Sequence, residues 1–464
     1  MPIIAESDND GELMAPGSNA RKPNPYRAIL KREFPEPFIA LLAFVLGLWL
    51  WDHYVGASEE YAPGTEDLAL IRIDRDLRLA DAMEKDPEWL RWMMGVASPG
   101  EAHANARRSL EKLAAGKGLG FEGLEAFAVV EAVGANADVG QVVMEVTGGP
   151  AVVDHGMVEA ELASHQGTWW TAKLLEAHEE EAGWIGSWRQ VYERENSALR
   201  KRTLMARSVP WLAVLLGAFF VPQALSALRK GWRAKPKGYV GAWSLPMGLT
   251  VFFCATLAWI GFTSVLEIGM SSASGVHPVV WIFLDSAARV LPAFIALAWL
   301  FQRPHHVMRA FGWSRRLNLP VVLGALCLLS MIDFPLRWWL GRELPVEPGG
   351  GLSAMEAGPW GLGFAIVSAC LLGPFIEELL YRGVLFQSFW NRFGTVVGAM
   401  LSTVMFSLLH IYDGYGFASV AFFGFIAALL YAGTGSIPTV VLLHVIYNSL
   451  IKLPEWFVYH APLG

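Results

Sequence analysis

The chain has 464 residues, of which 54% are hydrophobic and 17% are charged, and it contains 20 tryptophans. A soluble protein of this length carries more charge, so the composition indicates a membrane protein with several spans. The formal net charge is −7. Because no domain is basic enough to neutralise phosphates, we expect no nucleic-acid partner. The three cysteines all lie in apolar runs, so no disulfide framework is expected.

The N-terminal part predicts a tail followed by a membrane anchor. Residues 1–36 are polar and rich in Pro, Asn and Gly, which is typical of a disordered tail. Residues 37–55 are apolar, and Trp49, Trp51 and Tyr54 suit a membrane interface. The run has no small-residue cleavage site, so we expect a retained anchor and not a cleaved signal peptide.

Residues 56–206 form an acidic segment. They contain 26 Asp and Glu and 15 Lys and Arg, a net charge of −11, so the rest of the chain has a net charge of +4. Apolar residues recur at roughly helical spacing, which predicts a mostly helical extramembrane domain. The glycine-rich span 116–149 is less regular, and short strands are an open alternative there.

Apolar runs separated by short loops follow from Val209 onward. We divide this part into an N-terminal portion of the membrane bundle, 207–345, and a C-terminal portion, 346–464, which contains the polar motifs described below. Together with the anchor, the runs predict an all-α, polytopic membrane helix bundle of about nine spans with an inserted, mostly helical extramembrane domain. The expected runs are 209–227, 240–267, 277–301, 318–340, 359–391, 395–412, 416–434 and 437–453.

The charges of the loops predict an orientation. The segments 229–237 and 303–316 are strongly basic, whereas 267–277 has no Lys or Arg. The positive-inside rule then places the N-terminus in the cytoplasm and residues 56–206 on the extracytoplasmic side. We expect an integral protein of the bacterial inner membrane, with the lipid bilayer as a partner.

The first candidate functional residues are Glu377, Glu378 and Arg382, which follow a run without charges. Ionisable groups in a membrane helix are costly, roughly 2.5–3.5 kcal/mol each for Asp, Lys or Arg at mid-membrane, so at least one is expected to be functional. On a helix, Glu378 and Arg382 share a face, while Glu377 points about 100° away. We therefore expect a structural Glu378–Arg382 pair and a Glu377 that exchanges protons.

Three further polar residues lie in the last spans. Glu377 precedes Phe393 by 16 residues and His410 follows it by 17, so an antiparallel hairpin places both at one depth. A carboxylate and an imidazole that meet there can activate a water molecule. His444 and Asn448 are four residues apart and could bind the oxyanion of a tetrahedral intermediate. Alternatively, Glu377, His410 and His444 could bind zinc, and the spacing leaves both possibilities open.

The motifs Glu377-Glu378-x-x-x-Arg382, Phe406-x-x-x-His410 and His444-x-x-x-Asn448 resemble those of the CPBP family, the CAAX proteases and bacteriocin-processing (Abi) enzymes. The resemblance covers roughly residues 355–455. It implies an intramembrane endopeptidase that resembles CAAX prenyl proteases and cleaves a membrane-associated protein or peptide, which could be lipidated. Glu377 would activate water, His410 would assist it, and His444 with Asn448 would hold the oxyanion.

The sequence leaves two rival functions to compare with a protease. A proton-coupled carrier would use the same residues as a relay, but it predicts a second copy of the polar constellation, and none is found. A non-catalytic immunity or helper membrane protein would keep these residues for packing. The sequence favours a glutamic-type enzyme without cofactor, with zinc as the alternative.

Overall fold

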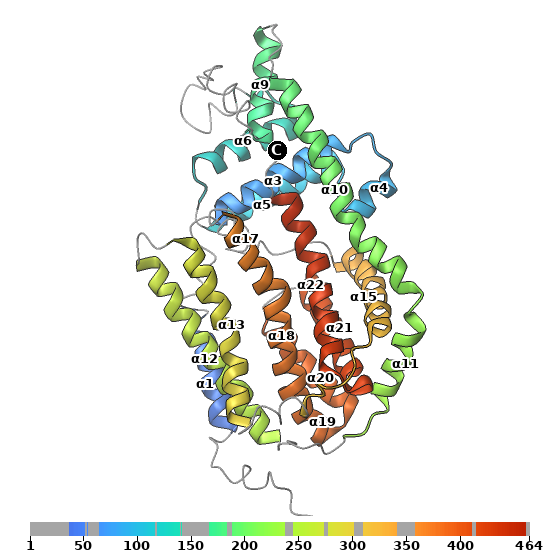
Figure 1. Ribbon diagram of the computed structural model, residues 1–464. Helices are drawn as coiled ribbons and strands as arrows, with labels where there is room; N and C mark the ends of the chain where they lie inside the picture. Colours follow the sequence, from blue (N-terminus) through green and yellow to red (C-terminus); the bar gives the residue numbers. More distant parts are fainter. Residues whose placement is uncertain are drawn as a thin grey trace, which may run out of the picture.

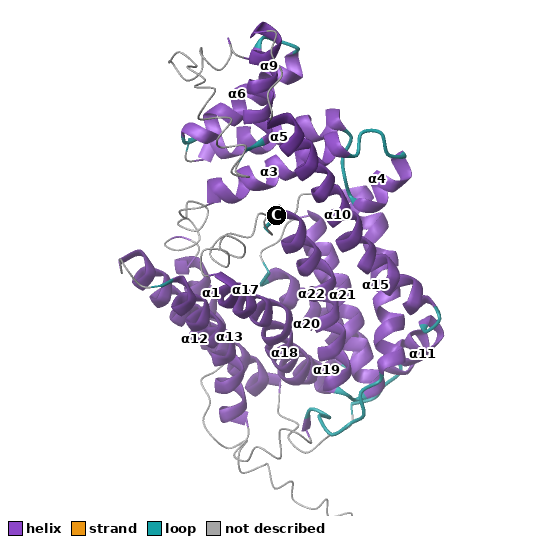
Figure 2. Ribbon diagram, turned by 45° about the horizontal axis from the view of Figure 1, so that its top comes forward, coloured by secondary structure: helices purple, strands orange, loops and turns teal. Residues whose placement is uncertain are grey.

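The computed structural model describes residues 37–51, 53, 65–116, 118–139, 141, 167–182, 188–236, 245–272, 277–300, 310–340, 358–410 and 414–460. Within these ranges the regular structure is helical and no strand occurs, which confirms the all-α class (Figure 2). The described part of 116–149 is mainly the helix α6, so no strand is found there, while residues 142–149 lie outside the described ranges. The predicted tail, 1–36, also lies outside them.

A group of helices forms the helical domain at the top of Figure 1. It shares a hydrophobic core that includes Trp169, Trp170 and Leu77, all almost fully buried. Helix α5 begins with a capping box, in which the Ser98 amide donates to Glu101 and the Glu101 amide donates to the Ser98 hydroxyl. The helices are α3 (Thr65–Ala82), α4 (Glu88–Met94), α5 (Pro99–Gly116), α6 (Phe121–Ala135), α9 (Trp169–Ala182) and the first half of α10 (Trp188–Ala218).

The buried guanidinium of Arg78 holds α3 against α10. Its Nε donates to Oδ1 of Asn196 at 2.6 Å and its NH2 donates to Oε2 of Glu195 at 2.7 Å. The guanidinium also lies over the ring of Tyr192, 4.7 Å from the centroid. Nearby, Asp74 accepts the backbone N–H of Trp169 at 2.6 Å, and burial raises the pKa of this carboxyl. A paired cluster of this kind fixes the mutual position of the helices.

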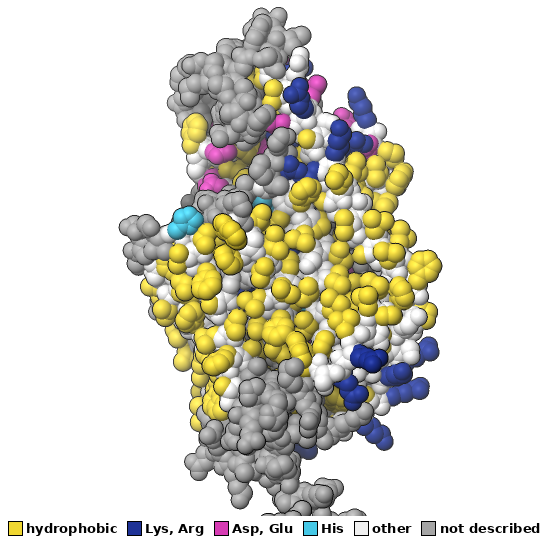
Figure 3. All heavy atoms as spheres, viewed as in Figure 1, with side chains coloured by type: hydrophobic (Ala, Val, Ile, Leu, Met, Phe, Trp, Pro, Cys, Tyr) yellow, Lys and Arg dark blue, Asp and Glu magenta, His cyan; other side chains and the backbone are white. Residues whose placement is uncertain are grey.

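Below the helical domain, the remaining helices form one bundle with a continuous hydrophobic core. Its exposed surface is a band of apolar side chains, seen in yellow in Figure 3. The helices are α1 (Pro37–Trp51), the second half of α10, α11 (Val221–Trp232), α12 (Leu245–Ser272), α13 (Pro278–Leu300), α15 (Leu319–Leu340), α17 (Gly358–Ile366), α18 (Gly373–Glu378), α19 (Gln387–Phe393), α20 (Thr395–Leu408), α21 (Gly414–Thr434) and α22 (Ile437–Tyr459).

The number of candidate spans is smaller than predicted. Among the described residues, six helices or helical runs are long and apolar enough to cross a membrane, and a seventh results if the bent pair α10–α11 is one span. The two helices α1 and α20, which the sequence counted as spans, have 15 and 14 described residues. A span needs about 20 residues. The predicted count of nine is therefore not confirmed.

The helical domain is joined to the bundle by a shared helix and by side-chain bonds. Helix α10 runs without a break through the predicted boundary at residues 206 and 207. At the end of α22, the hydroxyl of Tyr459 donates to Oδ1 of Asp76 at 2.6 Å and accepts NH2 of Arg207 at 2.9 Å. Arg72 also lies 3.6 Å from Glu455. These contacts fix the C-terminal end of α22 against α3 and α10.

The turn between α19 and α20 sets the register of the hairpin that carries the candidate site. Gly394 adopts φ +83°, a conformation that side chains rarely tolerate. One turn later, Gly398 packs directly on the backbone of α19, where a Cβ would contact Trp390. The two helices can therefore approach closely and run back along each other.

Candidate active site

Two π-helical segments interrupt the helical run from Gly358 to Phe393. The segment η3 (Val367–Leu372) precedes α18, and η4 (Leu379–Phe386) follows it. Segments with i→i+5 hydrogen bonds are rare and frequently occur at functional sites. The carboxylates Glu377 and Glu378 occupy the last two positions of α18, between these segments.

Glu377 faces both histidines. Its Oε2 lies 3.9 Å from Nε2 of His410 and 3.8 Å from Nε2 of His444. The Oε2 atom is itself buried and makes no direct hydrogen bond. These separations are longer than a hydrogen bond but short enough for one small molecule to contact all three atoms. The side chain of Glu377 is 30% exposed and that of His410 is 24% exposed, so the pair remains accessible.

Glu378 points into the core and has two partners. Its side chain is fully buried, and Oε1 lies 2.8 Å from NH1 of Arg382 and 2.8 Å from Nδ1 of His444. Arg382 also donates to the carbonyl of Gly424 at 3.2 Å and lies over the ring of Phe406, 4.7 Å from the centroid. The structure thus contains the expected Glu378–Arg382 pair and extends it to the imidazole of His444.

The hydrogen bonds define the tautomers of both neutral imidazoles. Nδ1 of His410 is 2.7 Å from the carbonyl oxygen of Phe406, which can only accept, so Nδ1 carries the proton. Nδ1 of His444 donates in the same way to the Glu378 carboxylate. Each Nε2 therefore presents a lone pair toward Glu377 and can accept a hydrogen bond from water.

The amide of Asn448 binds the backbone of η3. Its Nδ2 donates to the carbonyl oxygen of Ala369 at 3.2 Å. In η3 the amide of Gly373 donates to the carbonyl of Ser368, five residues earlier. In the same pattern, the amide of residue 374 would donate to the carbonyl of Ala369. Residue 374 is proline, which has no N–H, and Asn448 supplies the missing donor. The second N–H of this amide can still donate to another group.

Glu377, His410 and His444 offer ligand atoms for a metal ion. Two imidazole lone pairs and a carboxylate oxygen are ligand types that zinc uses. However, within the described part of the chain, no three His, Cys, Asp or Glu side chains are placed to hold a metal ion. The separations of 3.8 and 3.9 Å also exceed the spacing of about 3.4 Å expected between ligands of one tetrahedral zinc ion. A zinc ion bound to all three side chains would therefore require them to move closer together.

Another polar cluster, which the sequence analysis did not identify, lies between α15, α21 and α22. Oδ1 of Asp333 accepts the hydroxyls of Tyr415 at 2.5 Å and Ser419 at 2.9 Å. The Ser419 hydroxyl is also 3.1 Å from that of Tyr447, three residues after His444 on α22. The sequence could have indicated this cluster. Asp333 is the single carboxylate in the apolar run 319–340, and a carboxylate in a membrane helix is costly.

Comparison with protein families gives one match that covers these motifs. Residues 359–450 match a family model described as Rce1-like: Type II CAAX prenyl endopeptidase Rce1-like. Residues 359–450 form an Rce1-like domain. The Rce1-like domain contains every residue that the sequence analysis assigned to the site: Glu377, Glu378, Arg382, His410, His444 and Asn448.

The match supports a CAAX-type intramembrane protease with a bilayer and a protein or peptide substrate as partners, and it gives no support to the carrier or helper alternatives. No curated protein and no solved structure matches the chain. The helices before residue 359, including the whole helical domain, lie outside the family match.

Proposed function

We propose that the Rce1-like domain hydrolyses a peptide bond of a membrane-associated substrate, with Glu377 as the general base. The observation that carries the proposal is the position of Glu377 Oε2, 3.9 and 3.8 Å from the Nε2 atoms of His410 and His444. A water molecule hydrogen-bonded to Oε2 has both imidazoles within reach. Glu377 removes its proton, and the lone pair of His410 Nε2 orients it for attack.

The tetrahedral intermediate requires donors for its oxyanion. Because its Nδ1–H is used by Glu378, the neutral His444 has only a lone pair at Nε2, so it helps to position the water instead of donating to the oxyanion as expected. The second N–H of Asn448 is the candidate donor. Collapse of the intermediate breaks the C–N bond, and the proton held by Glu377 passes to the amine leaving group.

The proposed function is tested in membranes that contain either the wild-type chain or the variant Glu377→Ala. Protein termini are compared by mass spectrometry, and the variant membranes should accumulate uncut forms of the natural substrate. Purified wild-type enzyme should convert these forms to the cut ones. Identical termini in both membranes at equal protein level would overturn the proposal.

We further propose that the reaction needs no metal. The support comes from the separations of 3.9 and 3.8 Å between Glu377 Oε2 and the two Nε2 atoms, which are wider than the spacing of about 3.4 Å between ligands of one tetrahedral zinc ion. Purified enzyme dialysed against a strong chelator should keep its activity and contain no stoichiometric zinc by elemental analysis. Loss of activity that only added zinc restores would contradict this mechanism.

We propose that the helical domain lies on the extracytoplasmic side and positions the substrate. His410 lies 15 residues from the first residue of α20, about 22 Å along the helix from the α19–α20 turn. The site is therefore in the half of the bundle nearer the helical domain.

The orientation is tested with single cysteines. The variant Gly100→Cys, at a position with open space around it, should react with an impermeant maleimide in intact cells. Lys235→Cys, at the opposite end, should react only after permeabilisation, and the reverse pattern would overturn the orientation.

A further inference from the structure

Among the described residues, the end of the bundle far from the helical domain carries basic side chains and no acidic ones. From Ser197 to Leu266 the sequence has no Asp or Glu. The same holds for the described residues around the other connections at this end, 310–319, 388–396 and 431–438. These segments lie close together, since the amide of Asn318 donates to Thr439 and the hydroxyl of Thr395 donates to the carbonyl of Ala234.

Helix α11 concentrates this charge. Its chain turns by 72° from α10, and its last residues and C-cap include Arg229, Lys230 and Arg233, all exposed. Within the described ranges, none of these three cations has an ion pair with an acidic side chain. In Figure 3, Lys and Arg side chains border the apolar band at the lower right, where no acidic side chain is visible.

The opposite face of α11 is fixed to the bundle. Ala224, Ala227 and Gly231 are buried and recur at helical spacing. A Cβ at Gly231 would contact the backbone of α21 at Leu429, so the two helices touch directly. The cations are therefore presented on a rigid platform and not on a flexible loop.

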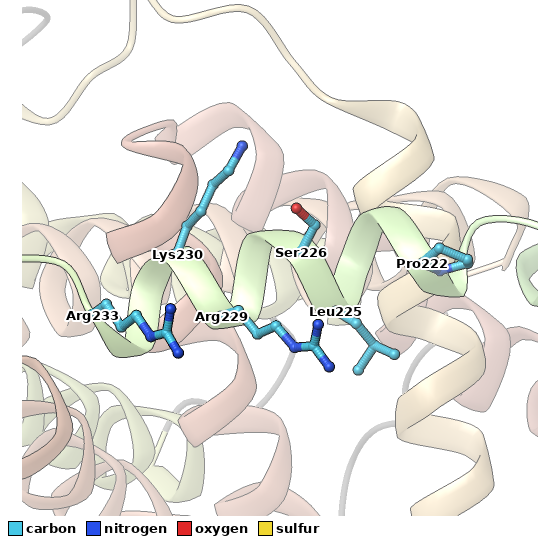
Figure 4. Close-up of a pocket in the computed structure, with 6 residues that line it drawn as sticks. All are labelled: Pro222, Leu225, Ser226, Arg229, Lys230 and Arg233. Carbon is cyan, nitrogen blue, oxygen red and sulfur yellow. The ribbon is translucent and has the colours of Figure 1, made fainter.

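The exposed face of α11 is hollowed, with apolar side chains in its first half and basic side chains in its second. The hollow is lined by Pro222, Leu225, Ser226, Arg229, Lys230 and Arg233. In Figure 4, the side chains of Arg229 and Arg233 extend to the same side as Leu225, and Lys230 extends with Ser226 to the other. Next to the hollow, the apolar side chains of Phe219 and Trp232 are 79% and 55% exposed.

We propose that this α11 hollow binds the headgroup of an anionic phospholipid. Guanidinium groups bind phosphate oxygens through paired hydrogen bonds, and Arg229 and Arg233 lie one helical turn apart on one side. Leu225, Phe219 and Trp232 are exposed apolar side chains at or near the cations in the sequence of this segment, and they contact the acyl chains. Charge complementarity favours an anionic lipid, since the hollow contains no carboxylate that would repel it.

The experiment uses the purified full-length chain in micelles of an uncharged detergent, titrated with phosphatidylglycerol. Bound lipid is counted by native mass spectrometry, and thermal unfolding is followed in parallel. We expect phosphatidylglycerol to bind and stabilise the wild type in preference to added phosphatidylcholine. The double variant Arg229→Gln, Arg233→Gln should bind it about tenfold more weakly.

The controls separate this site from general charge effects. Arg194→Gln, Lys201→Gln removes two exposed cations from α10 in the helical domain and should bind phosphatidylglycerol as the wild type does. Arg229→Lys, Arg233→Lys keeps the charge but cannot make the paired hydrogen bonds, so it should bind phosphatidylglycerol more weakly than the wild type and more tightly than the Gln variant. Equal binding by the Gln variant and the wild type would overturn the proposal. So would competition by millimolar inorganic phosphate, which would indicate a site for free anions.

Discussion

Nδ1 of His444 lies 2.8 Å from Oε1 of Glu378, so a fully buried carboxylate orients the imidazole that faces Glu377. The adjacent glutamates thus have different surroundings. Glu378 is paired with Arg382 and His444, while Glu377 is 30% exposed and faces two imidazole nitrogens without a direct hydrogen bond. The difference arises because neighbouring residues of a helix point about 100° apart.

The first prediction separates these two glutamates. Glu377→Gln should reduce kcat at least a hundredfold, because an amide cannot accept the proton of the attacking water, and general-base catalysis contributes about 10²–10⁴-fold. The midpoint of thermal unfolding should remain close to that of the wild type, since Glu377 is partly exposed and lies 3.8 and 3.9 Å from its two imidazole neighbours, beyond hydrogen-bond distance. Cleavage rate and unfolding are measured on the same preparation. Cleavage by this variant at the rate of the wild type would show that Glu377 is not the general base.

The second prediction concerns Arg382. Replacing it by Ala strands the buried Glu378 charge and removes the bond to the Gly424 carbonyl, at a cost of about 3–5 kcal/mol. The yield of folded protein and the unfolding midpoint should both fall. Arg392→Ala, which removes an exposed arginine ten residues later on α19, is the matched control and should unfold as the wild type does. Equal midpoints for the two variants would show that the buried pair contributes nothing to stability.

Parts of this site were predictable and others were not. The meeting of Glu377 with His410 follows from their nearly equal distances from the α19–α20 turn. The bond between Glu378 and His444 depends on how α22 rotates against α18, and helical periodicity does not specify the contacts between helices distant in sequence. The π-helical segments were not predicted either, because they depend on tertiary partners such as Asn448, which replaces the N–H that Pro374 lacks.

The same limit applies to the fold. Hydropathy identified the apolar runs and the all-α class, but it counted α1 and α20 as spans although their described helices have 15 and 14 residues. Composition placed a boundary at residue 206, where charge density changes. The backbone continues as one helix, whose Glu195 and Asn196 bind α3 and whose Arg207 binds the end of α22.

The third prediction tests Asn448 as an oxyanion donor. Asn448→Ala should lower kcat by about 10²–10³-fold with little change in KM, because a hydrogen bond made only in the transition state is lost. The bond to Ala369 is lost as well, so unfolding is measured in parallel. A fall in stability with normal kcat in the remaining folded enzyme would restrict Asn448 to supporting η3.

The fourth prediction concerns the Asp333 cluster. Asp333→Leu removes the acceptor of the Tyr415 and Ser419 hydroxyls, at about 1–3 kcal/mol for the buried hydroxyl of Tyr415, while Ser419 keeps Tyr447 as a partner. Stability should fall, and activity should fall with it because Ser419 contacts Tyr447 beside His444. Asp333→Asn keeps an oxygen acceptor and should stay within a few-fold of the wild type. If Asp333→Asn is strongly inactivated while its stability is unchanged, the charge of the carboxylate itself is required.

The last prediction is a pH dependence in the helical domain. The ring of His103 packs edge-on against Trp169, with 5.1 Å between centroids, and burial lowers its pKa although Asp81 acts in the opposite direction. The unfolded chain, in which His titrates near 6.5, therefore binds a proton more readily than the folded one. Stability should be full above about pH 6.5 and should decline as the pH falls from there through the lowered pKa of the folded state. His103→Phe keeps the aromatic contact and cannot titrate, so its unfolding midpoint should fall less between pH 7.5 and 5. Parallel curves for the variant and the wild type would show that His103 has the same pKa in both states.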